Sequence, residues 1–314
     1  MTWPTRGDVL EAAERILGVV VQTPLRAIDV GGTTVWLKCE SLQTGGAFKL
    51  RGASNRLLQL SAAERARGVV AFSSGNHAQG VGIAAARLGM PATIVMPSDA
   101  PALKIEATRA QGAEIVFYSR ASEDRVRIAR ALAESRGATL VPSFDDPAIV
   151  AGQGTVGLEI AAQLGRAPSR IVVPTGGGGL AAGIALACPE AELWCVEPAG
   201  WDDMARSLAG GAIVEVPADA PPTLCDALQT TRVSPITFGI LHAAGARGVA
   251  VSEEEIAAAV RLAWRALGLV VEPGGAVALA AVMTRRVPVD GDTVVVLSGG
   301  NIDPALHARI VAED

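Results

Sequence analysis

Short runs of β-branched and other apolar residues alternate with alanine-rich stretches along most of the chain. Apolar runs at 69–72, 92–96 and 114–118 are each followed by a stretch with helical periodicity. Strands that alternate with helices are typical of parallel sheets covered by helices on both faces. The pattern predicts an α/β protein that contains three consecutive βα units. The helices of these units are expected at 76–88, 102–111 and 122–136.

The alternation continues after these units and predicts further strands and helices. Proline-containing polar segments at 142–147 and 217–222 are the clearest breaks, and the first one closes the run of βα units. With 314 residues, 50% of them apolar, the chain is long enough for two domains. We expect a small domain over 51–145 and a large domain formed by 1–50 and 146–314. The further strands are expected at 170–174, 193–197 and 293–297, and the helices at 180–188, 253–267 and 276–284.

Charge and hydropathy narrow the classes of partner. The net charge is −5, and no stretch concentrates lysine or arginine, so the chain lacks the electrostatic footprint of a nucleic-acid or anionic-membrane binder. The most apolar late segment, 267–282, is interrupted by Glu272-Pro273-Gly274-Gly275, which argues against a membrane span. These features favour a small-molecule partner.

The cysteine and histidine residues exclude further classes. The four cysteines form no CxxC pair, and the N-terminus lacks the apolar core of a signal peptide, so we expect reduced, mostly buried thiols in a cytoplasmic protein. The three histidines never stand four residues apart, which argues against a zinc site built on histidines.

The segment Pro174-Thr175-Gly176-Gly177-Gly178-Gly179-Leu180 lies between an expected strand and an expected helix. Each glycine costs about 1 kcal/mol relative to alanine in a regular element, so four in a row need a reason. A loop without side chains lets backbone N–H groups converge on an anion at the start of the helix, whose dipole adds to the attraction. A flexible turn is the alternative, but we favour a phosphate-binding loop.

Two more polar turns follow expected strands in the same way. The segment 73–80, Ser-Ser-Gly-Asn-His-Ala-Gln-Gly, is either a simple helix cap or a second anion site suited to a carboxylate. The segment 298–301, Ser-Gly-Gly-Asn, follows the strand expected at 293–297. The carboxyl ends of the strands are where an open α/β sheet gathers its ligands.

Only three of the 27 basic residues are lysines. Lys38 and Lys104 are expected to be solvated charges that arginine could replace. Lys49 is expected at the start of a helix, where the helix N-terminus and the nearby Arg51 would lower the pKa of its ammonium group. A neutral amine can act as nucleophile or base, and an amine beside a phosphate-binding loop points to pyridoxal phosphate (PLP).

The chain resembles the PLP-dependent serine/threonine dehydratase and serine racemase family, known as fold type II, over nearly its whole length. The resemblance is carried by four motifs in family order: Gly46-Ala47-Phe48-Lys49-Leu50-Arg51-Gly52, Ser73-Ser74-Gly75-Asn76-His77, the four glycines at 176–179, and Ser298-Gly299-Gly300-Asn301. It implies a large PLP-binding domain and a small domain that closes on the substrate. It also implies a homodimer or homotetramer.

The resemblance assigns roles to residues of these motifs. Lys49 would carry the cofactor as an internal aldimine, and Ser74 would be an acid/base on the opposite face of the ring. The cofactor would also contact Phe48, Asn76, Gly176, Gly177, Gly178, Gly179, Leu180 and Ser298, with Asn76 at the ring hydroxyl and Ser298 at the pyridine nitrogen. The substrate carboxylate would bind the loop of Ser73, Ser74, Gly75, Asn76 and His77.

The segment Val196 to Asp203 resembles the divalent-cation loop of the same family. The carboxylates of Glu197 and Asp203 and the backbone carbonyl of Trp201 would supply hard oxygen ligands for Mg²⁺, Ca²⁺ or Mn²⁺. The alternative is a solvated acidic loop that caps the next helix.

The reaction implied is the α,β-elimination of L-threonine, L-serine or 3-hydroxyaspartate to a 2-oxo acid and ammonia. A serine-type amino-acid racemase is the alternative, and a non-catalytic binding module for a phosphate ligand is a remote one.

The sequence departs from many relatives at Ala47, where they have serine. It also departs at 223–240, a stretch that we cannot match to the serine and threonine enzymes and that favours another substrate such as 3-hydroxyaspartate.

Overall fold

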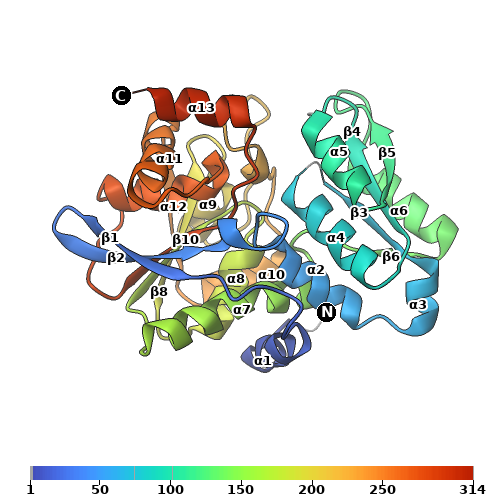
Figure 1. The fold of residues 1–314 in the computed structure, drawn as a ribbon, viewed down its shortest axis with the longest axis horizontal. Helices are drawn as coiled ribbons and strands as arrows, with labels where there is room; N and C mark the ends of the chain where they lie inside the picture. Colours follow the sequence, from blue (N-terminus) through green and yellow to red (C-terminus); the bar gives the residue numbers. More distant parts are fainter. Residues whose placement is uncertain (1–2, 74, 101, 314) are drawn as a thin grey trace.

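The computed structural model describes residues 3–73, 75–100 and 102–313 and contains two separate β-sheets. Figure 1 shows the two sheets side by side, each with its own helices. The strands are β1 (Leu25–Val30), β2 (Thr33–Cys39), β3 (Val69–Phe72), β4 (Ala92–Pro97), β5 (Glu114–Tyr118), β6 (Thr139–Leu140), β7 (Arg170–Pro174), β8 (Glu192–Pro198), β9 (Arg247–Val251) and β10 (Thr293–Leu297).

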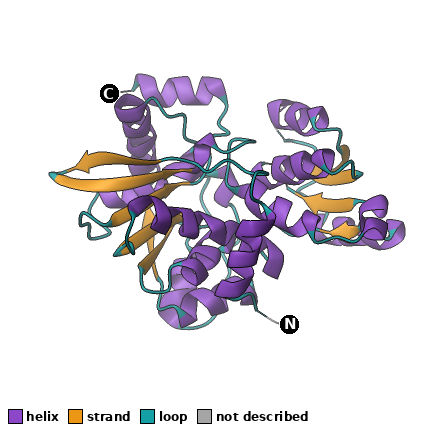
Figure 2. Ribbon diagram, turned by 60° about the horizontal axis from the view of Figure 1, so that its bottom comes forward, coloured by secondary structure: helices purple, strands orange, loops and turns teal. Residues whose placement is uncertain are grey.

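The helices cover the faces of both sheets, as the ribbon in Figure 2 shows. The helices of the first half are α1 (Arg6–Arg15), α2 (Lys49–Leu58), α3 (Ala62–Arg67), α4 (Asn76–Arg87), α5 (Ala102–Ala110) and α6 (Arg125–Arg136), with the 3₁₀ helix η1 (Glu40–Leu42). Those of the second half are α7 (Pro147–Leu164), α8 (Gly179–Ala187), α9 (Asp203–Gly210), α10 (Pro235–Ala243), α11 (Glu253–Leu267), α12 (Pro273–Met283) and α13 (Pro304–Ala312), with η2 (Asp226–Leu228).

The six-stranded sheet has the order β1-β2-β10-β7-β8-β9, and only its edge pair β1–β2 is antiparallel. Its central strands are buried on both faces. In β7, Ile171 and Val173 pack in the hydrophobic core that includes α7 and α8, whereas Val172 packs in the core that includes α11 and α12. This period of two is what a strand between two helical layers requires.

The four-stranded sheet has the order β5-β4-β3-β6 and is parallel throughout. Val69 and Ala71 of β3 pack in a core with α2 and α4, and Val70 packs in a second core with α6. Helix α2 crosses the domain boundary expected at residue 50 and packs against both α4 and α7.

The observed fold confirms the predicted α/β class with mainly parallel sheets. All the strands and helices that the pattern predicted are present, although α6 begins at Arg125 rather than 122 and α12 begins at Pro273 rather than 276. Asp124 caps α6 by accepting from the amide groups of Val126 and Arg127, which fixes the later start. The pattern did not single out α7, a glycine-rich helix, or the edge strands β1 and β9.

All four cysteines are buried and free, as expected. Among the described residues, no helix combines the length and the apolar character needed to cross a membrane.

Candidate active site

A cavity of about 460 Å³ lies where the three glycine-bearing turns meet. The turns follow the carboxyl ends of β3, β7 and β10, so strands from both sheets contribute to its wall. Its lining includes Lys49, Ser73, Asn76 and Ser298, together with the glycine loop 176–179. The structure thus brings the motifs together that the sequence singled out, although they are separated by up to about 250 residues along the chain.

Lys49 is the first residue of α2, as predicted, and its ammonium group is buried. Its Nζ donates to the carbonyl oxygen of Ser143 at 3.1 Å and lies 5.0 Å from the centre of the Phe48 ring. Burial lowers the pKa of Lys49 to about 8, while the nearby Glu272 opposes the shift. The predicted direction of the pKa shift agrees with this value, and the neutral amine is accessible near physiological pH.

Arg51 is not the cause of this shift, contrary to the sequence prediction. Its guanidinium group is fully buried on the other side of α2, where it binds Glu40 and Glu159. Lys38 is also fully buried and binds Glu159 at 2.6 Å, so the expectation of a solvated lysine was wrong there. We call these four residues the Arg51 cluster.

Lys104, expected to be solvated, is mostly buried and forms an ion pair with Asp226 at the cavity.

The glycine loop forms a wall without side chains. Gly178 has a φ angle of +83° and stands as the N-cap of α8, which has no capping side chain. The first N–H groups of this helix therefore lack intrahelical partners. A Cβ atom at Gly177 would lie 2.2 Å from Cδ1 of Phe144, so the loop packs too closely against that ring for any larger residue. The uncapped start of α8 suits an anion held by backbone N–H groups, whereas packing against Phe144 explains why residue 177 is glycine.

The loop after β3 faces the cavity through Ser73, Gly75, Asn76 and His77, whereas Ser74 lies outside the described residues. His77 is buried, and its Nε2 donates to the carbonyl oxygen of Val141 at 2.9 Å. Burial and the charge of Lys49 lower the pKa of His77 to about 3, so the ring is neutral. His77 therefore ties its loop to the backbone of Val141.

Sequence reasoning missed two polar residues at the cavity. Glu272 is buried, lines the cavity, and accepts from Nδ2 of Asn76 at 2.5 Å. Burial raises the pKa of Glu272 to about 7. Asn301 donates from its Nδ2 to Oδ1 of Asn76 at 2.8 Å. In the sequence, Glu272 was noted only in the segment that interrupts the apolar stretch 267–282, and Asn301 only in the turn 298–301. Neither segment gives a local sign that its side chain contacts Asn76.

The expected metal loop places two carboxylates together away from the cavity. Glu197 is buried at the end of β8 and accepts from the backbone amides of Met204 and Ala205 at 3.1 and 2.8 Å. Asp203 is also buried, and neither of its carboxylate oxygens has a hydrogen-bond partner among the described residues. Burial and the charge of Asp203 raise the pKa of Glu197 well above its ordinary value, and burial raises that of Asp203 to about 6.

Both carboxylates of the loop are buried and not solvated, but the capping part of the alternative is observed, because Glu197 accepts from the Met204 and Ala205 amides in the first turn of α9. Trp201 lies in the same turn, where its backbone N–H donates to the carbonyl oxygen of Pro198 at 3.0 Å. Across the described part of the chain, no group of three or more His, Cys, Asp and Glu side chains is arranged to hold a metal ion. Any cation here would need backbone or water ligands in addition to the two carboxylates.

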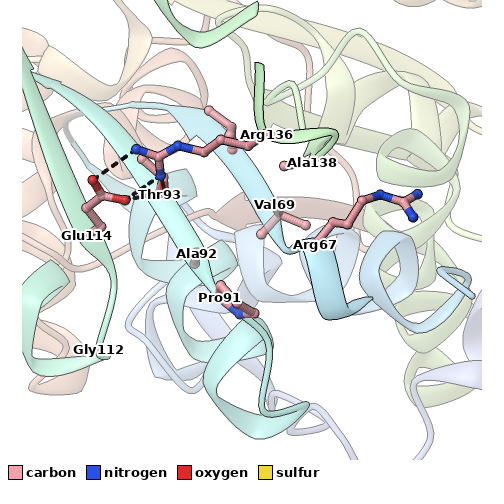
Figure 3. Close-up of a pocket in the computed structure, with 10 residues that line it drawn as sticks. Arg67, Val69, Pro91, Ala92, Thr93, Gly112, Glu114, Arg136 and Ala138 are labelled. Carbon is pink, nitrogen blue, oxygen red and sulfur yellow. Dashed lines mark hydrogen bonds and ion pairs between the residues drawn. The ribbon is translucent and has the colours of Figure 1, made fainter. Parts of the chain in front are cut away.

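A second cavity, of about 280 Å³, lies at the amino ends of β3, β4 and β5, away from the turns described above (Figure 3). The guanidinium group of Arg136 in its wall is already bound to Glu114 and Thr93. Arg67 donates to the carbonyl oxygen of Gly137 at 2.6 Å. These polar groups of the cavity are thus partnered within the protein, and we assign it no role.

The two parallel sheets, and the lysine and glycine loop between them, are features of an α/β enzyme with a phosphate-bearing cofactor. Residues 16–299 match the family described as pyridoxal-phosphate dependent enzyme, and the chain belongs to this family. It is 44% identical over 313 residues to an L-threo-3-hydroxyaspartate ammonia-lyase of a Pseudomonas species, and the match covers 97% of each chain.

Two solved structures are similar over almost the whole chain. Maize serine racemase has a TM-score of 0.92 at 33% identity, covering 98% of this chain and 97% of the other. A threonine deaminase of T.th. has a TM-score of 0.88 at 41% identity, covering 96% of this chain and 99% of the other. The resemblance recognised in the sequence is therefore confirmed, and so is the fold class.

Proposed function

We propose that the protein is a PLP-dependent ammonia-lyase that converts a 3-hydroxy amino acid to a 2-oxo acid and ammonia. The observation that carries the proposal is the buried Lys49 amine, with its pKa lowered to about 8, in one cavity with the glycine loop. The Pseudomonas relative named L-threo-3-hydroxyaspartate ammonia-lyase supports 3-hydroxyaspartate as the first substrate to test. L-threonine and L-serine follow, since the threonine deaminase is similar over 96% of this chain.

The residues of the cavity fit PLP. Lys49 offers the amine that would hold the aldehyde carbon, and the loop from Gly176 to Leu180 offers uncapped N–H groups for the phosphate. Phe48 stands beside Lys49 and would pack against the cofactor. Asn76 would contact the ring hydroxyl, and Ser298, which is buried and lines the cavity, would face the ring nitrogen. When bound, the cofactor supplies an electron sink that acidifies the Cα proton of an amino acid.

The chain's own groups supply the proton transfer and the substrate binding. The neutral Lys49 amine would remove the Cα proton, because a base with a pKa of about 8 is efficient near neutral pH. The substrate carboxylate would bind the loop of Ser73, Gly75, Asn76 and His77 at the start of α4. A Ser298 hydroxyl does not hold the ring nitrogen protonated as a carboxylate would, which favours prompt loss of the β-hydroxyl group.

The racemase remains the second candidate function. Its support is the high similarity to maize serine racemase over 98% of the chain. Ser74 would be the acid/base on the opposite face of the cofactor ring.

We further propose that the domain of residues 51–145 closes over the substrate bound to the domain of residues 1–50 and 146–314. The Lys104–Asp226 ion pair at the cavity supports this proposal, since it joins α5 of the small domain to η2 of the large one. Such closure would exclude water from the reacting atoms.

We also propose a divalent cation, Mg²⁺, Ca²⁺ or Mn²⁺, at Glu197 and Asp203 with the Trp201 carbonyl and water as further ligands. The support is chemical: the Glu197 and Asp203 carboxylates are buried, the pKa of each is raised, and a bound cation would favour their ionised forms. We propose a homodimer or homotetramer in the cytoplasm as the working form.

The function is tested with purified holoprotein and a panel of L- and D-serine, L-threonine and L-threo-3-hydroxyaspartate. Release of 2-oxo acid and appearance of the other enantiomer are measured in the same reactions. We expect release of 2-oxo acid to be the faster process, with L-threo-3-hydroxyaspartate as the best substrate. Enantiomer formation without 2-oxo acid would make the protein a racemase, and no turnover of any substrate would overturn both activities.

A further inference from the structure

Three side chains form a hydrogen-bonded chain on the cavity wall. Glu272 comes from the start of α12, Asn76 from the start of α4, and Asn301 from the turn after β10. Nδ2 of Asn76 donates to Oε1 of Glu272 at 2.5 Å, and Nδ2 of Asn301 donates to Oδ1 of Asn76 at 2.8 Å. We call these residues the Asn76 triad. It ties together elements that belong to both sheets.

The triad fixes the orientation of the Asn76 amide. Asn301 uses its second N–H to donate to the carbonyl oxygen of Gly45 at 2.8 Å, so only donors of Asn301 face Asn76. A flipped Asn76 amide would set its oxygen against the Glu272 carboxylate and its NH₂ group against the Asn301 NH₂ group. Both contacts would be lost. In the observed orientation, one N–H of Asn76 is left to donate to a ligand.

Glu272 serves the triad instead of its own helix. It is the N-cap residue of α12, a position whose side chain commonly accepts from the first amides of the helix, but its side chain makes no such bond. The carboxylate is 3% exposed and turns to Asn76 instead. Because the buried Glu272 carboxylate binds Asn76 and not the amides of its own helix, we infer a role for it at the cavity.

Two motif glycines make room for the triad. A Cβ atom at Gly299 would lie 2.2 Å from Oε1 of Glu272 and 3.1 Å from Nδ2 of Asn76. A Cβ atom at Gly46 would lie 2.3 Å from Oδ1 of Asn301. Any side chain at either position would displace a member of the triad. The space requirement of the triad thus gives a reason for glycine at 299, and at 46 it adds to the positive φ angle of +73° that already favours glycine.

The charged groups that influence Glu272 come from three elements. Lys49 of α2 and Lys104 of α5 lower its pKa, and Asp226 of η2 raises it, but burial outweighs them and raises the pKa to about 7. The carboxylate and its protonated form are therefore both accessible near neutral pH. Only the carboxylate accepts with both oxygens, so the ionised form holds the Asn76 amide most firmly.

We propose that Glu272 and Asn301 are positioning residues that act through Asn76 and keep an amide N–H group available for the phenolic oxygen of bound PLP. This inference rests on the proposed function, since it takes PLP as the ligand of the cavity. Glu272 and Asn301 do not themselves need to contact the cofactor. They fix which atom of Asn76 meets it.

The test measures the dissociation constant of PLP from the apoprotein and the visible absorption band of the bound cofactor between pH 6 and 9. We expect Glu272→Gln and Asn301→Ala each to weaken PLP binding about tenfold, the effect of losing a hydrogen bond to a positioned or charged group. Both substitutions are also expected to shift the visible band or its pH dependence. Asp145→Asn is the matched control, because Asp145 is another acid that lines the same cavity but is not among the groups that shift the pKa of Glu272.

A double-mutant cycle separates positioning from general stability. In the background of Asn76→Ala, we expect Glu272→Gln and Asn301→Ala to change PLP binding by less than about twofold, because their route to the cofactor is gone. Additive effects in that background would overturn the proposal. Single substitutions that leave the affinity for PLP and the visible band as they are in Asp145→Asn would also overturn the proposal.

Gly299→Ala is an independent route to the same answer. It keeps all three polar side chains and adds a methyl group against Glu272, and the backbone at Gly299 does not require a positive φ angle. We expect it to reproduce the band of Glu272→Gln, and a wild-type band would contradict the proposal.

If the wild-type apoprotein binds no PLP, the proposed function fails. If it binds PLP and the triad substitutions have no effect, only this inference fails.

Discussion

The Arg51 cluster and the Glu197–Asp203 pair both bury two carboxylates, but they differ in the charges around them. In the Arg51 cluster, Arg51 and Lys38 bind Glu40 and Glu159 at 2.6–2.8 Å, so positive and negative charges balance. Burial alone would raise the pKa of Glu40, but Arg51, Lys38 and the Thr23 hydrogen bond together outweigh burial and hold the pKa below its ordinary value.

The Glu197–Asp203 pair has the opposite electrostatics. The hydrogen bonds to Glu197 come from neutral backbone amides, and the pKa of both acids is raised. A balanced buried cluster is a structural element, whereas buried carboxylates left unbalanced are a common mark of a binding or catalytic site. Glu272 belongs to the second kind, since its pKa is also raised, to about 7.

The largest expected effect is on stability, at the Arg51 cluster. Arg51→Met leaves Glu40 and Glu159 without their main partner, and we expect it to lower the free energy of unfolding by about 3–5 kcal/mol. Urea unfolding of wild type and variant measures this loss. The control is Arg120→Met, whose exposed ion pair with Asp99 is expected to matter by less than about 1 kcal/mol. Equal effects of the two substitutions would remove the distinction between balanced and exposed pairs.

The next effect concerns metal removal at the Glu197–Asp203 pair. At about 100 times its dissociation constant, Mg²⁺ is expected to add about 2.7 kcal/mol to the stability of the wild type, and a chelator to remove it. Asp203→Asn is expected to abolish this response. Thermal unfolding with Mg²⁺ and with chelator measures it, and a Tm that is the same in both solutions would count against the cation site.

The two regions are expected to respond to pH with opposite signs. The folded-state pKa of Asp203 is raised to about 6 from an ordinary value of 3.8. The contribution of Asp203 to the free energy of unfolding is therefore favourable below pH 3.8 and is lost as the pH rises to about 6. The pKa of Glu40 is lowered, so Glu40 contributes to the free energy of unfolding at neutral pH, and this contribution is lost on acidification.

In chelator, Asp203→Asn is therefore expected to gain stability relative to wild type as the pH rises from about 4 to 6. Glu40→Gln is expected to be less stable than wild type at neutral pH, and this deficit is expected to shrink only as the pH falls below 4.5. Urea midpoints at several pH values measure both differences. Parallel curves for the two variants would contradict the assigned pKa shifts.

The smallest expected effect is on the rate of cofactor uptake. In the proposed role of Lys49, its neutral amine would react with the PLP aldehyde, and the pKa of Lys49 is lowered to about 8. The rate at which apoprotein takes up PLP is expected to rise with pH and to level off above about 8, as followed by visible absorption. A rate that still climbs towards pH 10 would show that Lys49 titrates as an ordinary lysine.

The sequence was sufficient to predict the parts of the site that are contiguous along the chain. The glycine loop, Lys49, Asn76 and Ser298 each follow a strand or begin a helix, and the topology of a parallel sheet brings such turns together. The same reasoning predicted the fold class, because two-sided burial imposes a visible pattern on strands such as β7.

The rest depended on tertiary contacts that leave no local pattern. Glu272 lies 196 residues from Asn76 and yet accepts its hydrogen bond. Lys38 and Arg51 looked like ordinary basic residues, and only the assembled structure shows that both bind Glu159 of α7. The lowered pKa of Lys49 was predicted from a helix end and Arg51, whereas burial in the assembled cavity is its cause.

The most direct test of the central claim is to find which lysine carries the cofactor. Holoprotein reconstituted with PLP is reduced with borohydride, which fixes the cofactor on the lysine that holds it, and the peptides are analysed by mass spectrometry. The chain offers Lys38, Lys49 and Lys104. We predict the adduct on Lys49 alone. An adduct on Lys104, or no adduct on any lysine, would contradict the assignment of the cavity as a PLP site.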